Sequence, residues 1–170
     1  MMEETMLHTI HDKLKEKFGE EIMEAQMSYD FPVFTVKKDK IVEIIQYLKE
    51  DPEMGFQYLT DLCGIHFPNA KDHELGVVYH LHNLPKNKRI RLKLYTSIHD
   101  PSVPTLTSLF SAANWMERET FDFFGIVFKG HPNLKRILNV EDMNYFPLRK
   151  EFPLEDATRE DKDDTMFGRG

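Results

Sequence analysis

Apolar residues recur at steps of three and four in two stretches near the start of the chain, a spacing typical of amphipathic helices. The first stretch predicts a helix over residues 7–18 that ends at Gly19. The second predicts a helix over residues 41–48. It closes at Asp51-Pro52, because a residue that precedes proline is disfavoured in the α region.

Shorter apolar stretches, bounded by turn-forming residues, are typical of β-strands. They predict strands over residues 22–28, 33–36, 56–67, 74–84 and 89–97. In the last of these, Ile90, Leu92 and Leu94 alternate with polar residues, which indicates a sheet with one buried face and one solvated face.

A third helix is predicted over residues 105–124, where apolar residues again keep helical spacing until Gly125. The order of helix, strands, helix, strands and helix is typical of an α+β fold, with helices packed on one face of a mixed or antiparallel sheet. We place this globular domain at residues 1–138.

Residues 139–170 show neither helical nor strand periodicity and contain Pro147 and Pro153. The charge is uneven here: residues 129–150 hold five bases and two acids, whereas residues 151–170 hold seven acids and three bases. Aromatic and apolar residues in such a segment need a surface to cover them. We therefore predict an extended C-terminal arm that binds a partner protein.

Composition limits the class of protein. The 170 residues include 22 basic and 29 acidic side chains, which gives a net charge of −7, and 41% of the residues are hydrophobic. That is one globular domain on a prior of about 100–200 residues per domain. An acidic chain is a poor binder of nucleic acid, because contacts with phosphates need clustered Lys and Arg.

The chain also lacks the usual marks of membrane insertion and secretion. The longest uncharged stretch, residues 101–116, is polar in part and contains Pro104, whereas a membrane span needs roughly 20 apolar residues. The acidic first residues do not resemble a secretory signal. Cys63 is the single cysteine, so we expect no internal disulfide and a reducing, cytoplasmic environment.

The densest group of charged residues runs from Glu117 through Arg118, Glu119 and Asp122 to Gly125. On a helix Arg118 and Asp122 are four residues apart and share a face. Two interpretations stay open: a charged surface that receives groups from a partner, or a solvated helix face whose ion pair contributes about 0.3–0.5 kcal/mol.

Two other groups of residues are candidates for chemistry. His80 and His82 lie two apart on a predicted strand, and both could face one zinc ion, although two ligands do not make a site. Cys63 could be a nucleophile, but a buried inert thiol is the default for such a position. The chain has no phosphate-binding glycine loop and no multi-cysteine run for an iron–sulfur cluster, so it binds no obvious redox cofactor.

Two runs of sequence nevertheless resemble a known family. Residues 117–138, ERETFDFFGIVFKGHPNLKRIL, are similar to the signature of the 30-kDa subunit of proton-translocating NADH:quinone oxidoreductase, which is respiratory complex I. Residues 146–155, FPLRKEFPLE, resemble the ending of the same family. The signature positions that match are Glu117, Arg118, Glu119, Asp122, Gly125, His131, Pro132, Lys135, Ile137 and Leu138. In two places the chain departs from the pattern: Tyr145-Phe146 replaces Gly-His, and Glu151 replaces Asp.

This resemblance implies a structural subunit of the peripheral arm with no active site of its own. FMN, iron–sulfur clusters, NADH and quinone are bound by other subunits of the family's complex. The C-terminal arm of this subunit passes over the neighbouring 49-kDa subunit, which helps to form the quinone site. The 30-kDa subunit would lie on the cytoplasmic face of a bacterial inner membrane, attached only through the complex.

The resemblance also suggests roles for individual residues. We expect Arg118, Glu119 and Asp122 to fix the contact of the globular body with His131, with Arg136 or with the start of the arm. Four residues of the arm would then bind the partner: Arg149, Lys150, Phe152 and Leu154.

Three alternatives remain open at this stage. The chain could be the equivalent subunit of an ion-pumping membrane-bound hydrogenase or a related dehydrogenase. It could be a separate metal or thiol enzyme that uses His80, His82 and Cys63. It could also be an acidic binding module unrelated to respiration.

Overall fold

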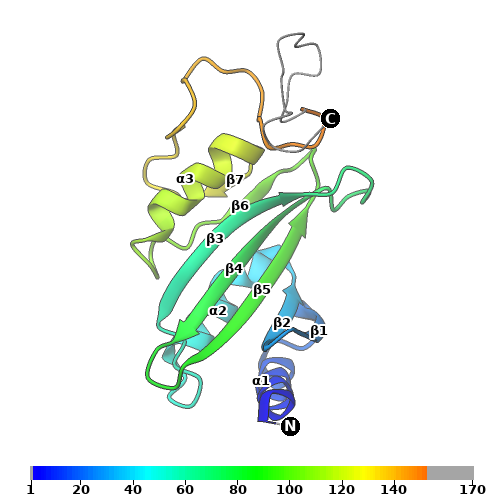
Figure 1. The fold of residues 1–170 in the computed structure, drawn as a ribbon, viewed down its shortest axis with the longest axis vertical. Helices are drawn as coiled ribbons and strands as arrows, with labels where there is room; N and C mark the ends of the chain where they lie inside the picture. The colour runs from blue at the N-terminus through cyan, green and yellow to red at the C-terminus, as the bar shows by residue number, and fades with distance from the viewer. Residues whose placement is uncertain (1, 153–170) are drawn as a thin grey trace, which may run out of the picture.

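The computed structural model describes the backbone of residues 2–152 and the side chains of residues 6–152. This part of the chain forms three α-helices and two sheets (Figure 1). The helices are α1 (Met2–Phe18), α2 (Ile41–Glu50) and α3 (Ala113–Phe124).

The larger sheet has five strands in the spatial order β1-β2-β5-β4-β3. In chain order these strands are β1 (Ile22–Ser28), β2 (Phe31–Val36), β3 (Tyr58–His66), β4 (Leu75–Asn83) and β5 (Lys88–Thr96). Strands β2 and β5 are parallel, and the other three neighbouring pairs are antiparallel. The sheet is therefore mixed, and β3 forms one of its two edges.

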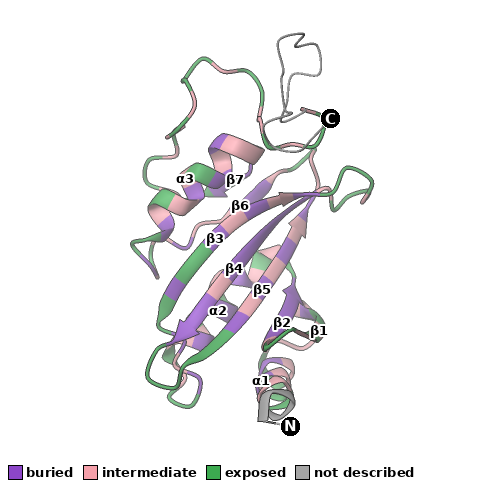
Figure 2. Ribbon diagram, in the orientation of Figure 1, coloured by how far each residue is buried: buried purple, intermediate pink, exposed green. Residues whose placement is uncertain are grey.

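All three helices pack on one face of this sheet. Each helix contributes to the single apolar core, with Leu14 from α1, Ile44 from α2 and Ala113 from α3. On the sheet side of the core, Tyr79 and Leu92 pair across β4 and β5 and are fully buried. Figure 2 shows that β4 is buried along most of its length. The predicted fold class, an α+β domain with helices on one face of a mixed sheet, is confirmed.

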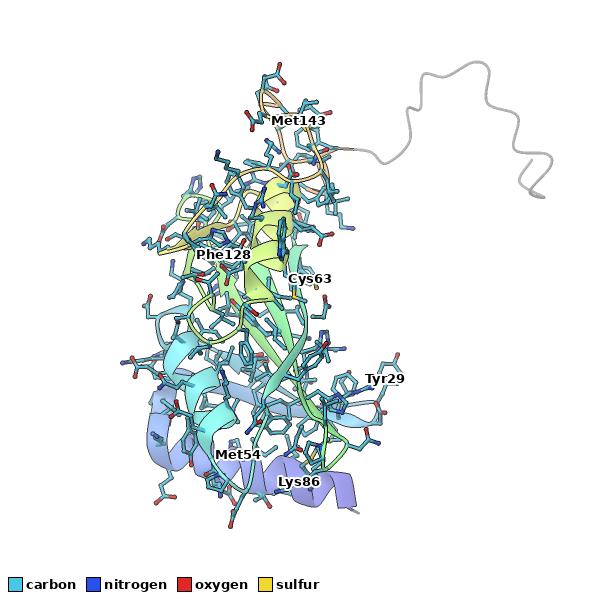
Figure 3. The ribbon with its side chains drawn as sticks, turned by 90° about the vertical axis from the view of Figure 1, so that its left-hand side faces the viewer. Tyr29, Met54, Cys63, Lys86, Phe128 and Met143 are labelled. Atoms are coloured by element: carbon cyan, nitrogen blue, oxygen red, sulfur yellow. The ribbon has the colours of Figure 1, made fainter. Side chains whose placement is uncertain are left out.

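Most predicted elements match the observed ones to within about two residues at each end. Helix α1 ends at Phe18, and Gly19 follows with a φ of +52°. Strands β1 and β2 are joined through Tyr29, which has a φ of +57° and is 98% exposed. Figure 3 shows this tyrosine pointing away from the body of the protein.

The prediction of a helix over residues 105–124 was wrong at its start, because α3 begins only at Ala113. The apolar spacing of Leu106 and Phe110 reflects one isolated turn, in which the Phe110 N–H donates to the Leu106 carbonyl at 2.9 Å. The Leu106 N–H donates instead to a carboxylate oxygen of Glu117 at 2.6 Å. This long-range contact holds residues 105–112 apart from the helix.

Two three-residue strands were not predicted: β6 (Ser102–Pro104) and β7 (Val127–Lys129) pair in parallel and flank α3 in the sequence. After β7, residues 130–152 contain no helix or strand. Of the predicted arm, residues 139–152 lie within the described part of the chain and run past the end of α3 (Figure 1).

Candidate interaction site

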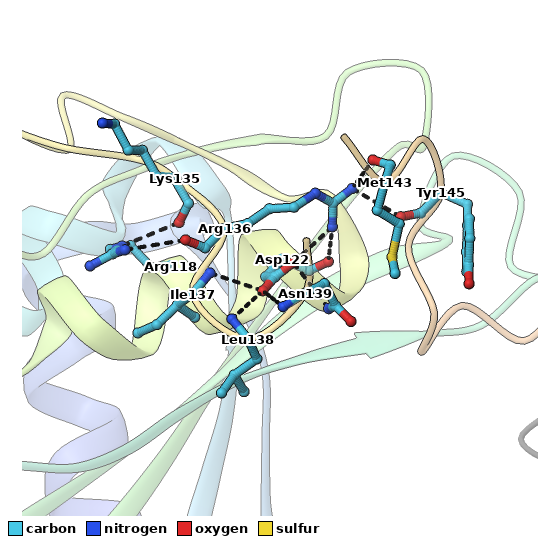
Figure 4. A network of polar contacts seen from close by, with 9 residues as sticks. All are labelled: Arg118, Asp122, Lys135, Arg136, Ile137, Leu138, Asn139, Met143 and Tyr145. Atoms are coloured by element: carbon cyan, nitrogen blue, oxygen red, sulfur yellow. Dashed lines mark hydrogen bonds and ion pairs between the residues drawn. The ribbon is translucent and has the colours of Figure 1, made fainter. Parts of the chain in front are cut away.

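The carboxylate of Asp122 lies at the centre of the charged group on α3 (Figure 4). It is fully buried, and Oδ2 accepts hydrogen bonds from three consecutive backbone N–H groups, those of Ile137 at 3.0 Å, Leu138 at 2.8 Å and Asn139 at 2.9 Å. Oδ1 accepts from Arg136 Nη1 at 2.7 Å and from Asn139 Nδ2 at 3.0 Å. Burial by itself raises the pKa of this carboxyl, but the backbone donors and Arg136 outweigh it and hold the pKa well below its usual range.

The guanidinium of Arg136 extends the same network toward the arm. Its Nη1 also donates to the Asp122 carbonyl at 2.8 Å, and its Nη2 donates to the carbonyls of Met143 at 2.7 Å and Tyr145 at 3.0 Å. One arginine therefore joins the last turn of α3 to two points on the segment that follows residue 139.

Arg118 fixes the same segment one turn earlier on the helix. Its Nε donates to the Lys135 carbonyl and its Nη2 to the Arg136 carbonyl, both at 3.2 Å. The guanidinium also lies over the ring of Trp115, 5.1 Å from its centroid. Arg118 and Asp122 thus each bind residues 135–139, and no ion pair joins them to each other within the described structure.

Phe146 packs between two arginines at the end of α3. The guanidinium carbon of Arg136 is 5.1 Å from the Phe146 ring centroid, and that of Arg149 is 4.6 Å from it. Gly125 ends the helix with a φ of +76°, and a Cβ atom there would lie 2.5 Å from Phe146 Cε2. Glycine is therefore required both for the backbone conformation and for the close approach of the arm.

The arm also satisfies carbonyls that every helix leaves free at its C-terminus. The Leu148 N–H donates to the Phe123 carbonyl at 3.2 Å, and Arg149 Nε donates to the Phe124 carbonyl at 2.8 Å. We call the five side chains Arg118, Asp122, Arg136, Phe146 and Arg149 the α3 clasp.

A separate contact joins the arm to the sheet. The Lys150 N–H donates to Nδ1 of His66, the last residue of β3, at 2.9 Å. His66 is buried, and a Glu151 carboxylate oxygen lies 3.5 Å from the same nitrogen. The described part of the arm is thus attached to both α3 and β3.

Glu117 is a second fully buried carboxylate on α3. Its carboxylate accepts hydrogen bonds from the Thr105 hydroxyl at 2.5 Å and from the Leu106 N–H at 2.6 Å. Burial raises the pKa of Glu117 to about 7, although both hydrogen bonds oppose the shift. Its role in the structure is to join α3 to the chain just after β6.

The other predicted site residues contribute in different ways. His131 Nδ1 accepts the Asn133 N–H at 3.0 Å, so its Nε2 carries the proton and donates to the Asn114 carbonyl at 3.0 Å. Lys135 contributes through its carbonyl. Glu119 is exposed and forms no hydrogen bond or ion pair with a described residue.

At the end of the described chain, Phe152 packs against Tyr145 with ring centroids 4.9 Å apart. Leu154 lies outside the described residues, so the prediction that it binds a partner is left as it stands.

Sequence reasoning missed three residues that the site uses: Asn139, Phe146 and His66. Asn139 follows the signature directly, but nothing in its local sequence indicates that it would bind Asp122. Phe146 belongs to one of the two departures from the family pattern. Its ring packs between the guanidinium groups of Arg136 and Arg149. His66 has no local signal, because its partner is 84 residues away in sequence.

The residues of the alternative metal or thiol enzyme have other partners in the sheet. His80 Nε2 accepts from Arg91 Nε at 2.8 Å, and its Nδ1 lies 3.4 Å from an Asp61 carboxylate oxygen. Burial raises the pKa of the Cys63 thiol. Among the residues that the structure describes, no three His, Cys, Asp or Glu side chains are grouped so that they could hold a metal ion.

None of the helices in the described chain has both the length and the apolar character that crossing a membrane requires. Most polar groups of the site are used in contacts within the chain. What this arrangement does chemically is to hold residues 135–152 against α3 and β3.

Comparison with known proteins places these features in a family. Residues 34–158 match the family described as the 30 Kd subunit of respiratory-chain NADH dehydrogenase. A relative from Roseiflexus sp. (strain RS-1), named as a subunit of NADH-quinone oxidoreductase, is 42% identical over 147 residues, which are 86% of this chain and 83% of the relative. A protein of the same name from Methylobacterium sp. (strain 4-46) is 40% identical over 148 residues, 87% of this chain and 68% of that protein.

Two solved structures are also similar. A trypsin-resistant fragment of Nqo5 superposes with a TM-score of 0.62 at 29% identity, covering 79% of this chain and all of the fragment. A chain of the membrane-bound sulfane sulfur reductase, an archaeal respiratory membrane complex, superposes with a TM-score of 0.70. That chain is 24% identical over 86% of this chain and 85% of its own length, so the likeness is one of fold alone.

Proposed function

The chain belongs to the family of the 30-kDa subunit of respiratory-chain NADH dehydrogenase, and we propose that it serves there as a structural subunit with no active site of its own. It would join the peripheral arm of a proton-translocating NADH:quinone oxidoreductase. In that position it supports electron transfer from NADH to quinone without carrying the electrons itself.

This proposal rests on one observation: the residues of the family signature bind the chain's own arm. Three signature residues hold residues 135–149 against α3: Arg118, Asp122 and Gly125. A buried carboxylate with five donors and a depressed pKa is a poor acid or base at neutral pH. The signature thus suits a rigid support rather than a catalytic centre.

We assign the 49-kDa subunit, which helps to form the quinone site, as the main partner. The described part of the arm ends at Phe152, whose ring packs against Tyr145 two residues before Pro147. Aromatic and basic side chains at such a position are typical of the core and rim of protein interfaces. FMN, the iron–sulfur clusters, NADH and quinone would all be bound by other subunits, and the chain would reach the cytoplasmic face of the inner membrane only through them.

The proposal is tested by purifying the tagged full-length chain from native membranes in mild detergent and identifying the polypeptides that co-elute. We expect the 49-kDa subunit together with the NADH- and flavin-binding subunits, at equal stoichiometry. A nickel-ligating large subunit in their place would assign the chain to a hydrogenase-type complex. Elution of the chain alone from such membranes would contradict a structural role in either complex.

A second measurement addresses the lack of an active site. The purified lone chain should contain no stoichiometric metal and should not oxidise NADH. Stoichiometric zinc, or turnover of NADH by the chain alone, would revive the enzyme that uses His80, His82 and Cys63.

A further inference from the structure

An open groove lies between the end of β3 and the described end of the arm. Its volume is about 770 Å³. Residues 64–67 line one side, and residues 147–150 and Phe152 line the other. Phe124, from the end of α3, also lines it. The groove is therefore built from the same segments that the α3 clasp and His66 hold in place.

The side chains of the groove are mostly apolar, and several are open to solvent. Phe67 is 48% exposed and Leu148 is 38% exposed, both high values for large apolar residues on the wall of one groove. Exposed apolar residues that are grouped rather than scattered mark interaction sites.

The charged side chains that line the groove are both basic. They are Arg149 and Lys150, and no carboxylate of the described chain lines it. Glu151 does not line the groove, but its carboxylate lies 3.5 Å from His66 Nδ1 and attracts the Arg149 guanidinium. A basic groove on a chain of net charge −7 is a local reversal of sign that favours an acidic ligand.

Arg149 adds a more specific requirement. Its Nε donates to the Phe124 carbonyl, but its Nη groups donate to no described residue, and no carboxylate of the described chain lies within 4.0 Å of it. Burial lowers the pKa of this guanidinium, which reflects a cation that has lost part of its hydration. A partly desolvated arginine with unused donors is suited to a carboxylate, which it can bind through two parallel hydrogen bonds.

The opposite wall of the groove is formed by the end of β3. Strand β3 is an edge of the sheet, and its backbone pairs on one side only, with β4. The first half of this edge carries a register shift between Leu59 and Asp61, a feature that blocks pairing with another strand. The second half lines the groove and keeps a regular register, with Gly64 and His66 buried and Ile65 half-buried.

We propose that this groove binds an acidic segment of a partner polypeptide between the end of β3 and the arm. A carboxylate of that segment pairs with Arg149 and Lys150, and its apolar side chains cover Phe67 and Leu148. Only the identity of the partner, as another subunit of the complex, rests on the proposed function.

The test uses the purified full-length chain and synthetic octapeptides in which Val or Leu alternates with Glu, Gln or Lys. The Glu peptides should bind about tenfold more tightly than the Gln peptides and the Lys peptides more weakly still, because a charge-assisted hydrogen bond stabilises more than a neutral one. Lys150→Glu should abolish the preference for Glu. It leaves the Lys150 backbone N–H, and thus the contact with His66, in place.

The matched control is Lys129→Glu, which makes the same change of charge on β7, away from the groove. It should keep the preference for Glu peptides within about twofold. Equal binding of Glu and Gln peptides, or a preference that survives Lys150→Glu, would overturn the proposal.

A peptide with the sequence of residues 153–170 distinguishes a partner from the chain's own continuation. Tighter binding of this peptide than of every Glu octapeptide would assign the groove to the chain itself and overturn the assignment to a partner. Because these assays use the isolated chain, their result does not depend on which polypeptides co-elute from membranes. Failure of the groove and failure of the proposed complex are therefore separate outcomes.

Discussion

Arg136 Nη1 lies 2.7 Å from the Asp122 carboxylate, and the two side chains are only 9% and 0% exposed. Such a buried pair is costly to desolvate and is favourable only when further hydrogen bonds satisfy the remaining donors and acceptors. Here the carboxylate has four other donors and the guanidinium has three carbonyl acceptors. The pair therefore works as a fully satisfied network that positions the arm.

Asp122→Asn should lower the free energy of unfolding by about 3 kcal/mol, because it leaves the Arg136 guanidinium buried without its counter-ion. Urea unfolding followed by circular dichroism measures this loss. Glu119→Gln, an exposed change on the same helix, should alter stability by less than about 0.5 kcal/mol. Equal stability of the two variants would show that the network does not hold the fold.

The same network predicts a pH dependence. Asp122 has a folded-state pKa below its ordinary value of 3.8, so the carboxylate's stabilisation is present above pH 3.8 and is lost as the pH falls toward the folded pKa. The difference in stability between the wild type and Asp122→Asn should therefore shrink below pH 3.8. A difference that stays constant down to the acid transition would contradict this.

Gly125→Ala should release the arm from α3. A Cβ atom at Gly125 would lie 2.5 Å from Phe146 and 2.7 Å from Arg149 Nη2, so both side chains must move. We expect trypsin to cleave after Arg149 about tenfold faster in this variant, which corresponds to about 1.4 kcal/mol of local stability. Mass spectrometry of the first fragments measures the rate.

Gly19→Ala is the matched control for this experiment. Gly19 also has a positive φ, +52°, but no atom lies within 4 Å of its Cβ position. Both variants carry the backbone strain of about 1 kcal/mol, and only Gly125→Ala adds the steric clash. Similar cleavage after Arg149 in the two variants would mean that the clash does not displace the arm.

The elements that could be predicted from sequence are those whose signal is local. The buried face of α2, with Ile41, Ile44 and Leu48, follows from the period of an α-helix. The start of α3 could not be predicted in the same way, because the Leu106 N–H is held by Glu117 eleven positions on. A helical spacing of apolar residues is equally compatible with one turn and with three.

The site shows the same limit more strongly. The resemblance to a family selected Asp122 and Arg136, but their contact spans 14 positions and depends on the path of the loop between them. The hydrogen bond from Arg149 to the Phe124 carbonyl was not predicted, because the two residues are 25 positions apart and neither carries a local signal for the contact. Signature residues were thus found from sequence, whereas their partners needed the fold.

Glu117 predicts a second pH dependence, of opposite sign. Its folded pKa, about 7, lies above the ordinary value of 4.5, so the folded state binds the extra proton. This stabilisation is fully present below about pH 4.5 and is lost as the pH rises through 7. The wild type should therefore lose on the order of 2 kcal/mol of unfolding free energy between pH 5 and pH 8.

Glu117→Gln isolates this effect, because glutamine cannot ionise and can still accept the Leu106 N–H. Urea unfolding at several pH values should give a weaker dependence for this variant, which becomes more stable than the wild type at pH 8. Tyr79→Phe is the control for removing a buried polar group that does not ionise in this pH range. The Tyr79 hydroxyl has no partner in the described chain, so its loss should change the free energy of unfolding by less than about 0.5 kcal/mol. A Glu117→Gln profile that follows the wild type would place the source of the dependence elsewhere.

Glu119 is the signature carboxylate that the described chain does not use, since it is exposed and has no hydrogen-bond or ion-pair partner there. Glu119→Lys should leave the free energy of unfolding unchanged within about 0.5 kcal/mol. In the proposed complex it should reduce co-purification with the partner subunits about fivefold, which corresponds to the ~1 kcal/mol expected for an exposed interfacial charge. Glu20→Lys makes the same change after α1, far from the clasp, and should co-purify normally. Quantitative mass spectrometry of the eluted complex separates the two variants, and equal recovery of partners with both would remove Glu119 from the interface.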